Sequence, residues 1–259
     1  MTPGFSHFCE VVFLVIIFIL LGLVIGSFLN VAIYRIPRKE SIVFPGSHCP
    51  ACGHRLAPEE LVPVLSYIWL RGRCRQCGTK ISPRYPLVEL LTGAIFAGLF
   101  FRFGLSFDLL KYLLLACVLV IVTFTDLEHM VIPDRVIVFT VISGIVLDIA
   151  TNAGFLPVVL GAFIPAALIY LLAVITKGGV GGGDIKLTFA AGLYLGWPGN
   201  ALAVAAAFLL GGIAGTALLV ARRKSRKDAM VFGPYLATGM MAAAIWGQQA
   251  IDWYLRFFI

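Results

Sequence analysis

Long apolar runs, separated by short polar joins, occupy most of this 259-residue chain. Hydrophobic residues make up 60% of the sequence and charged residues 13%, whereas roughly 25% of the residues in a soluble domain are charged. Because about 20 apolar residues let a helix cross a bilayer, the sequence predicts an all-α polytopic membrane protein. We expect about eight transmembrane helices, near residues 8–30, 86–102, 109–126, 135–151, 156–176, 185–197, 200–221 and 232–255. The sixth run is short, which predicts a tilted or re-entrant segment.

The net charge of +7 is concentrated in two stretches of the chain. Of the 20 Lys and Arg residues, nine lie between Arg35 and Arg84 and five between Arg222 and Lys227. Cytoplasmic loops of membrane proteins are rich in Lys and Arg, so both stretches are predicted to face the cytoplasm. With an external N-terminus, every basic cluster falls on that side, next to the anionic headgroups of the lipid bilayer. This placement argues against a nucleic-acid partner.

One sizeable polar region lies between the first two apolar runs, at residues 31–85. It is too small for a large hydrophobic core of its own, so it requires another source of stability. We therefore expect three parts: a first transmembrane helix (1–30), a cytoplasmic domain (31–85) and a membrane-embedded domain (86–259).

Four cysteines in the polar region form two CxxC pairs, Cys49 with Cys52 and Cys74 with Cys77, twenty-one residues apart. A glycine follows each pair and suits a tight turn that directs both sulfurs to one ion. Four thiolates satisfy tetrahedral Zn²⁺, and the spacing is close to the zinc-ribbon pattern. Two disulfides are the alternative, but disulfides are uncommon in a reducing cytoplasm. The sequence therefore predicts a small zinc-ribbon-like cytoplasmic domain, in which four cysteine ligands make the metal structural.

Two aspartates, Asp126 and Asp184, stand where apolar segments meet cytoplasm-facing loops. Charged residues are costly near a bilayer and usually mark a functional site. Two carboxylates at one site can divide the work of hydrolysis, because one takes a proton from water while the other stays protonated and polarises a carbonyl. We therefore predict that Asp126 and Asp184 form a catalytic pair.

Each aspartate stands beside a break in the helical pattern. Pro133 follows Asp126 and disfavours helical geometry in the residue before it, so we expect a helix to stop or restart near residues 132–134. Glycines dominate the run 177–184, which suits a close backbone approach. The residues predicted to form the active-site loops are Pro133, Asp134, Gly181, Gly182 and Gly183.

Simpler roles remain open for these acids. Asp134 has the sequence context of an N-cap for a helix that begins at Arg135, and Asp184 could also be a plain N-cap. A proton-coupled transporter is the alternative function, because transporters also use intramembrane carboxylates and broken helices. That function predicts acids near the middle of the membrane and paired repeats.

Several motifs combine into a family resemblance that covers almost the whole chain. They are GSFLNV (26–31), YRIP (34–37), PVLSY (63–67), ISPRYPLVE (81–89), IPD (132–134), GGGD (181–184) and FGPY (232–235), together with the paired CxxC loop. With these motifs the chain resembles the bacterial type IV prepilin peptidases, which are GxGD intramembrane aspartyl proteases.

The resemblance implies that the chain cleaves the short basic leader from type IV prepilins and pseudopilins. The cut would fall just after a glycine, at the cytoplasmic face of the bacterial inner membrane, with Asp126 and Asp184 as the catalytic pair. The family often also methylates the new N-terminal amine, which implies S-adenosylmethionine as a second cofactor beside Zn²⁺ and a methyltransferase region around the cysteine loop. Many members read Asp/Glu-Asn-Ile-Pro where this chain has Glu60-Leu61-Val62-Pro63. The apolar Leu61 cannot supply the hydrogen bonds of that asparagine, a departure that bears on methyl transfer alone.

Overall fold

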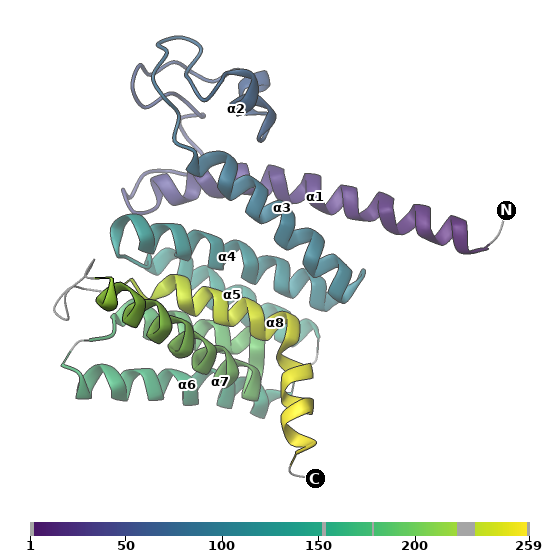
Figure 1. Cartoon of the computed structure of the whole chain (residues 1–259), viewed down its shortest axis with the longest axis vertical. Helices are drawn as coiled ribbons and strands as arrows, with labels where there is room; N and C mark the ends of the chain where they lie inside the picture. The colour runs from purple at the N-terminus through teal and green to yellow at the C-terminus, as the bar shows by residue number, and fades with distance from the viewer. Residues whose placement is uncertain (1–2, 152–153, 178, 222–230, 258–259) are drawn as a thin grey trace. The chain divides into compact units, whose positions relative to one another are not determined.

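The computed structural model describes residues 3–151, 154–177, 179–221 and 231–257. Within these ranges the chain is helical and contains no β-strand (Figure 1). The elements are α1 (Pro3–Arg35), the 3₁₀ helix η1 (Pro58–Leu61), α2 (Leu65–Trp69), α3 (Arg84–Phe103), α4 (Phe107–His129), α5 (Asp134–Ala150), α6 (Phe155–Ile175), α7 (Gly182–Val220) and α8 (Gly233–Leu255). The predicted all-α class is confirmed. The basic run 222–227 and Gly178 lie outside the described residues.

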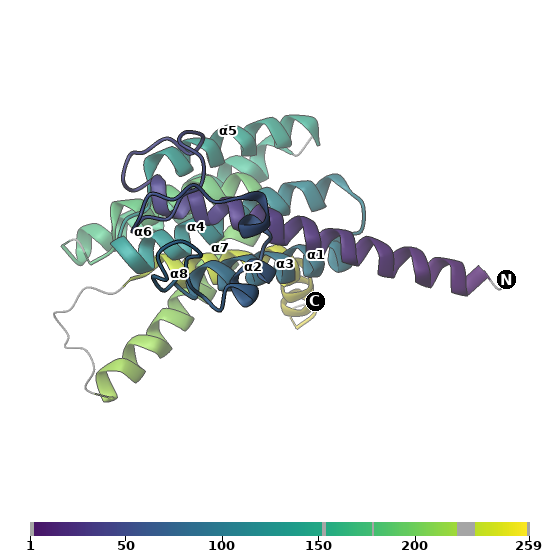
Figure 2. The same cartoon turned by 90° about the horizontal axis from the view of Figure 1, so that it is seen from above.

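Five helical segments among the described residues are long and apolar enough to cross a membrane. They are Glu10–Arg35, Arg84–Phe103, Phe107–His129, Phe155–Ile175 and Gly182–Val220. The last of these has 39 residues and loses helical geometry at Gly196 and Trp197, so its two halves run in different directions (Figure 2). The halves correspond to the predicted runs 185–197 and 200–221, while α5 and α8 correspond to 135–151 and 232–255. The multi-pass membrane architecture is thereby confirmed.

Two compact units make up the chain, residues 1–121 and 122–259. In the first unit α1 and α3 pack against each other and run antiparallel, since Gly22 faces Gly93 while Asn30 meets Tyr85. A Cβ added at Gly22 would lie 2.7 Å from the Gly93 Cα, which is the close backbone approach that small residues permit between membrane helices. The Asn30 amide nitrogen donates to the Tyr85 carbonyl at 3.0 Å, and this bond fixes the start of α3 to the end of α1.

In the second unit α7 packs against α5, α6 and α8. A Cβ at Gly192 of α7 would overlap the backbone of α6 at Gly161 and Ala162, so glycine is required at this contact. The buried side chain of Asn200 follows the break in α7 and donates to the Gly161 carbonyl at 2.7 Å and the Thr188 carbonyl at 2.9 Å. A buried carbonyl without a partner is costly, so Asn200 stabilises the region around the break.

The connection between α4 and α5 is short, as predicted. Helix α4 ends at His129, and α5 begins at Asp134. The prediction of Asp134 as an N-cap is wrong, because Pro133 occupies the cap position and no side chain bonds to the free N–H groups there. Asp134 instead lies in the first turn of α5, where a negative charge is favoured by the positive end of the helix dipole.

Candidate active site and candidate metal centre

Asp126 lies in the last turn of α4 and is only 7% exposed. Its Oδ2 accepts a hydrogen bond of 2.8 Å from the backbone N–H of Gly233, the first residue of α8. The first N–H groups of a helix have no partner inside the helix, so α8 offers one of them to the carboxylate. A Cβ at Gly233 would come within 2.6 Å of the same Oδ2. The position therefore requires glycine, and the carboxylate is held at a defined place.

Asp184 is the third residue of α7 and is also 7% exposed. Its reading as a plain N-cap is wrong, because the cap position belongs to Gly181 and no side-chain cap bond forms. The glycines around it allow close packing: a Cβ at Gly183 would lie 2.9 Å from the Ile132 Cβ. The first turn of α7 therefore lies directly against the segment that joins α4 to α5.

These contacts place the two predicted acids in the same unit, residues 122–259. Asp126 lies in the last turn of α4, and Asp184 lies in the turn of α7 that packs against the segment after α4. Both lie in the terminal turn of a long apolar helix and not at the middle of one. Two buried acids that interact electrostatically can exchange roles as proton acceptor and proton donor.

The predicted loop residues lie around this pair. Asp134 Oδ1 is 2.7 Å from Lys186 Nζ, so an ion pair joins the first turn of α5 to the fifth residue of α7. Both side chains are exposed, at 74% and 57%. The ion pair therefore connects the starts of α5 and α7 through exposed side chains, whereas the side chains of Asp126 and Asp184 are buried.

We expect this ion pair to contribute little to stability. Exposed pairs are typically worth about 0–1 kcal/mol because water and salt screen them. Lys186→Ala should lower the free energy of unfolding in detergent by less than ~1 kcal/mol, and added salt should abolish the difference. A double-mutant cycle with Asp134→Asn measures the coupling directly. A coupling energy well above that range would contradict the expectation.

The sequence motif 232–235 did not indicate this role of Gly233. The only sequence signal was a glycine followed by Pro234 at the start of an apolar run, a common opening for a helix. The bond from Gly233 to Asp126 spans 107 positions of the chain and becomes visible only in the folded protein.

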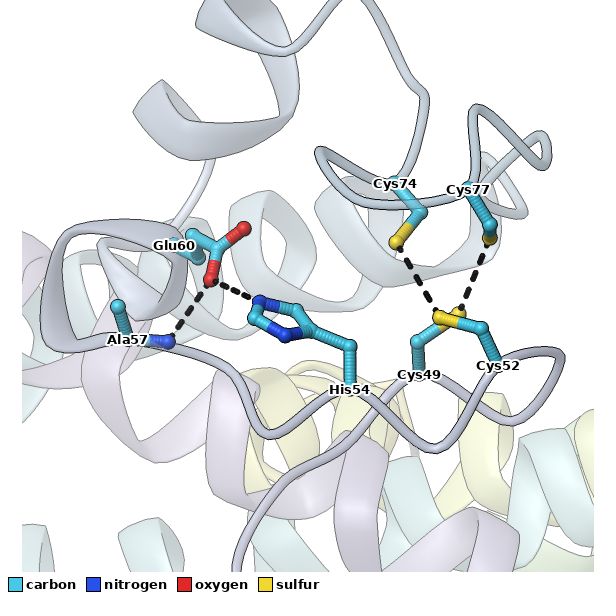
Figure 3. Close-up of polar contacts among 7 residues, drawn as sticks. All are labelled: Cys49, Cys52, His54, Ala57, Glu60, Cys74 and Cys77. Atoms are coloured by element: carbon cyan, nitrogen blue, oxygen red, sulfur yellow. Dashed lines mark hydrogen bonds and ion pairs between the residues drawn. The ribbon is translucent and has the colours of Figure 1, made fainter.

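The four cysteines converge as their spacing predicts (Figure 3). Their sulfur atoms all lie within 4.8 Å of one another. Cys49 Sγ is 4.0 Å from Cys77 Sγ, and Cys52 Sγ is 4.0 Å from Cys74 Sγ. Disulfide sulfurs would be about 2.05 Å apart, whereas four ligands at the usual Zn–S distance of ~2.3 Å are separated by about 3.8 Å in a tetrahedron. The cluster therefore fits a metal ion held by four thiolates.

The two CxxC turns repeat one hydrogen-bond pattern. In the first, Cys49 N–H donates to the His54 carbonyl and Gly53 N–H to the Cys49 carbonyl, each at 2.9 Å. In the second, Cys74 N–H donates to Thr79 and Gly78 N–H to Cys74, again at 2.9 Å. Gly53 and Gly78 have φ angles of 71° and 69°, a conformation that favours glycine. The glycine after each pair thus closes the turn that presents both sulfurs.

The second turn also favours the thiolate form of one ligand. The Thr79 hydroxyl, 3.3 Å from the Cys77 sulfur, together with the Thr79 backbone N–H lowers the pKa of Cys77 to about 6. Despite a hydrogen bond from the His54 backbone, desolvation and the neighbouring thiols raise the pKa of Cys52 to about 12, so the four thiols do not all ionise near neutral pH without a cation beside them.

These features define a helical, multi-pass membrane protein with a pair of buried aspartates and a four-cysteine cluster. Residues 20–103 match the family described as the bacterial peptidase A24 N-terminal domain. Residues 113–216 match the type IV leader peptidase family.

Curated relatives are similar to this chain over nearly the full length of both proteins. The chain is 36% identical to the prepilin leader peptidase/N-methyltransferase of Bacillus subtilis (strain 168), over 93% of this chain and 97% of that protein. It is 34% identical to the protein of the same name from Aeromonas hydrophila, over 93% of each chain. The corresponding protein of Pseudomonas aeruginosa PAO1 is 32% identical, over 92% of each. No solved structure matches significantly. The chain belongs to the type IV leader peptidase family, among the prepilin leader peptidase/N-methyltransferases.

The transporter alternative is not supported. Its prediction of acids near the middle of the membrane disagrees with the position of Asp126 and Asp184 in terminal helical turns. The relatives are named as peptidases and methyltransferases.

Proposed function

We propose that Asp126 and Asp184 are the catalytic pair of an aspartyl endopeptidase that removes the leader of type IV prepilins and pseudopilins. The observation that carries this proposal is the presence of two buried aspartates in one unit, at helix ends that are brought together by the close approach of Gly183 to Ile132. Family membership supplies the reaction, because the relatives are named prepilin leader peptidases. Pro133 and Gly181 directly precede α5 and α7, and Asp134, Gly182 and Gly183 lie in the first turns of these helices, so the predicted loop residues are proposed to surround the pair from the two helix starts.

The chemistry needs two carboxylates in different protonation states. The ionised aspartate takes a proton from water as the water oxygen attacks the scissile carbonyl, and the protonated aspartate donates its proton to the carbonyl oxygen. Collapse of the tetrahedral intermediate breaks the C–N bond: the leaving amine takes a proton from the aspartate that received it from water, and a hydroxyl of the intermediate returns a proton to the other aspartate. The bond from Gly233 to Asp126 orients one carboxylate, while Gly183 lets α7 bring the other beside the α4–α5 connection.

The four-cysteine cluster is proposed to bind structural Zn²⁺. Four sulfurs at tetrahedral separations leave no coordination site for a substrate. The ion would stabilise the segment 31–85, in which η1 and α2 are the only helices among the described residues after α1 and before α3. We propose this segment as the cytoplasmic domain, between a first helix (1–30) and the membrane-embedded peptidase domain (86–259).

A second activity, methylation of the new N-terminal amine, is proposed on the name that the relatives share, which includes N-methyltransferase. S-adenosylmethionine supplies an electrophilic methyl group when it is bound. The role proposed for this chain is to hold the methyl donor next to the amine and to exclude water. Leu61 replaces an amide side chain at one position of this region, so donor binding here depends on other polar groups.

The bilayer that holds the protein is proposed to be the inner membrane of a bacterium, with the aspartates and the cysteine domain at the cytoplasmic face. The nine basic residues between Arg35 and Arg84 support this orientation. They would also contact anionic headgroups, and no nucleic-acid partner is proposed.

One incubation tests both activities. The purified chain is mixed with a prepilin peptide, with and without S-adenosylmethionine, and the products are weighed. We expect loss of the leader mass in both reactions and a gain of one CH₂ on the mature fragment only with the methyl donor. An intact peptide would overturn the peptidase proposal, and an unmethylated product would overturn the second activity alone.

The contact between Gly233 and Asp126 predicts an effect on cleavage. The Cβ of Gly233→Ala would lie 2.6 Å from Asp126 Oδ2, so α8 or the carboxylate must shift. A displacement of ~1 Å at a catalytic group can cost about 10²-fold in rate, and we expect a loss of that order in kcat for leader cleavage. Gly212→Ala in α7 is the matched control, because a Cβ there meets nothing within 4 Å. Equal rates in the two variants would contradict the proposed contact.

A further inference from the structure

Helix α2 exposes its apolar side chains instead of burying them. Leu65, Ile68 and Trp69 are 64%, 65% and 86% exposed, and their spacing of three and four residues places them on one side of the helix. Another side of α2 packs within the segment 31–85, where a Cβ at Gly72 would lie 3.0 Å from the Tyr67 ring. We call Leu65, Ile68 and Trp69 the α2 face. Exposed apolar patches of this kind mark surfaces that contact a partner or a membrane.

A hydrogen bond fixes the start of α2 beside α3. The N–H of Val64, the residue directly before α2, donates to Glu89 Oε2 at 2.8 Å, and Figure 1 shows α2 next to the first turns of α3. Glu89 is buried. Val64 has a φ angle of 61°, which a β-branched residue keeps only where its surroundings impose it. The position of α2 along α3 is therefore defined by contacts within the first unit.

This contact lies inside the membrane-spanning segment that begins at Arg84. Helix α3 has 20 residues, or about 30 Å of helix, which matches the hydrocarbon thickness of a bilayer. Glu89 follows Arg84 by five residues and lies about 7.5 Å deeper along the helix axis. Its side chain leans back toward the helix start, so α2 begins within that depth. Amphipathic helices at a membrane surface bury their apolar face by about 5–10 Å, so the depth of α2 fits this class.

We propose that the α2 face is an interfacial membrane anchor, and that it lies among the lipids of the bilayer that α1 and α3 cross. Tryptophan is enriched at membrane interfaces because its ring is apolar and its N–H is polar. Arg71 and Arg73, which follow α2, are exposed and carry the charge that anionic headgroups attract. Cys74 comes five residues after Trp69, so the anchor also holds the cysteine cluster at the membrane surface.

A protein partner fits the α2 face less well than lipid does. A specific protein interface takes about 20–30 residues on each side, whereas α2 has five. The bond from Val64 to Glu89 also places α2 beside a membrane-spanning helix, where a partner dissolved in water would have to displace lipid.

The fluorescence of Trp69 tests the proposal in the full-length protein. The protein is reconstituted in bilayers of phosphatidylcholine and phosphatidylglycerol, with or without bromine atoms near the carboxyl end of the acyl chains. Because the chain has four tryptophans, the emission of a Trp69→Phe variant is subtracted from that of the wild type. Bromine quenches tryptophan on contact, so at a depth of roughly 5–10 Å we expect the Trp69 emission to fall at least about twofold. Acrylamide, a quencher dissolved in the water, should lower the same emission much less.

Glu40→Trp, made in the Trp69→Phe background, is the matched control. Asn30 of α1 bonds to Tyr85 in the first turn of α3, so Arg35, five residues later, lies about 7.5 Å further from the membrane core than Tyr85 does. The Glu40 N–H donates to the Arg35 carbonyl at 3.1 Å, and the Glu40 side chain is exposed. This tryptophan should be quenched by acrylamide and not by the brominated chains.

Ile68→Trp in the same background repeats the measurement from a second position of the α2 face, so a disturbance by one substitution does not decide the result. Monodisperse elution in detergent confirms that each variant is folded, and lipid quenching is expected at both positions. Quenching by acrylamide alone, at either position, places the α2 face in water and overturns the proposal. Protection from both quenchers shows that protein covers the face and overturns lipid as its partner. Equal lipid quenching of the Glu40→Trp control would overturn the assigned depth.

Discussion

Asp126→Asn and Asp184→Asn should each lower leader cleavage at least about 10³-fold, within the range that general acid–base groups contribute to catalysis. This loss corresponds to about 4 kcal/mol of transition-state stabilisation. Asparagine has nearly the shape of aspartate but can neither accept a proton from water nor donate one to the carbonyl oxygen. In the Asp126→Asn variant the Gly233 N–H can still donate to the side-chain amide oxygen, so the fold is expected to persist. Single-turnover cleavage of a prepilin peptide by purified protein measures the effect.

Asp252→Asn is the matched control for this pair. Asp252 lies in the same unit, on α8, where its side chain is exposed and accepts a hydrogen bond from Gln248 at 2.9 Å. We expect wild-type cleavage from this variant. Full cleavage by either Asp126→Asn or Asp184→Asn would remove the proposed catalytic role of that residue. The double variant should be no slower than the slower single variant, because residues that act as a unit give non-additive losses.

The sequence predicted the helices well because a bilayer imposes a strong and simple constraint. A segment inside lipid must satisfy its backbone polar groups within itself, so an apolar run of sufficient length is helical. The predicted positions of the helix ends and breaks were less accurate. The break expected between the predicted runs 185–197 and 200–221 lies at Gly196 and Trp197, and α1 continues to Arg35, five residues beyond its predicted end. Helix ends depend on local contacts, which hydropathy alone does not describe.

The cysteine cluster was predictable from its spacing because its ligands are close in sequence and its turns are local. The surroundings of the aspartates were not, because they depend on contacts between distant segments. Gly233 meets Asp126 only after α8 has packed into the second unit, and Asn200 bonds to carbonyls on two separate segments. Two N-cap expectations, for Asp134 and Asp184, were wrong for a related reason. Each acid lies inside the first turn of its helix, and a short motif cannot distinguish that position from the cap.

Loss of one cysteine ligand should have the largest effect on the first unit. Cys49→Ser replaces a thiolate by a neutral hydroxyl, which is a poor ligand for Zn²⁺ near neutral pH. Changes to outer-shell partners of a metal already cost about 10–100-fold in affinity, so the loss of a direct ligand should cost at least ~10²-fold. We expect less zinc bound per chain and faster proteolysis of the segment 31–85. Methylation should decline more than cleavage, because the catalytic aspartates belong to the other unit.

Cys117→Ser provides the matched control, because Cys117 lies on α4 and outside the four-cysteine cluster. It removes a thiol from the same unit and should leave zinc content unchanged. Among the described residues between α1 and α3, Cys49 and Cys74 are the only hydrophobic residues that are buried, so the loop has almost no hydrophobic core that could replace the proposed metal. The proposed zinc ion would therefore take the place of a hydrophobic core in this segment. Stoichiometric zinc in a variant lacking all four cysteines would show that the ion binds elsewhere, and an ordered loop without zinc would show that it is not needed.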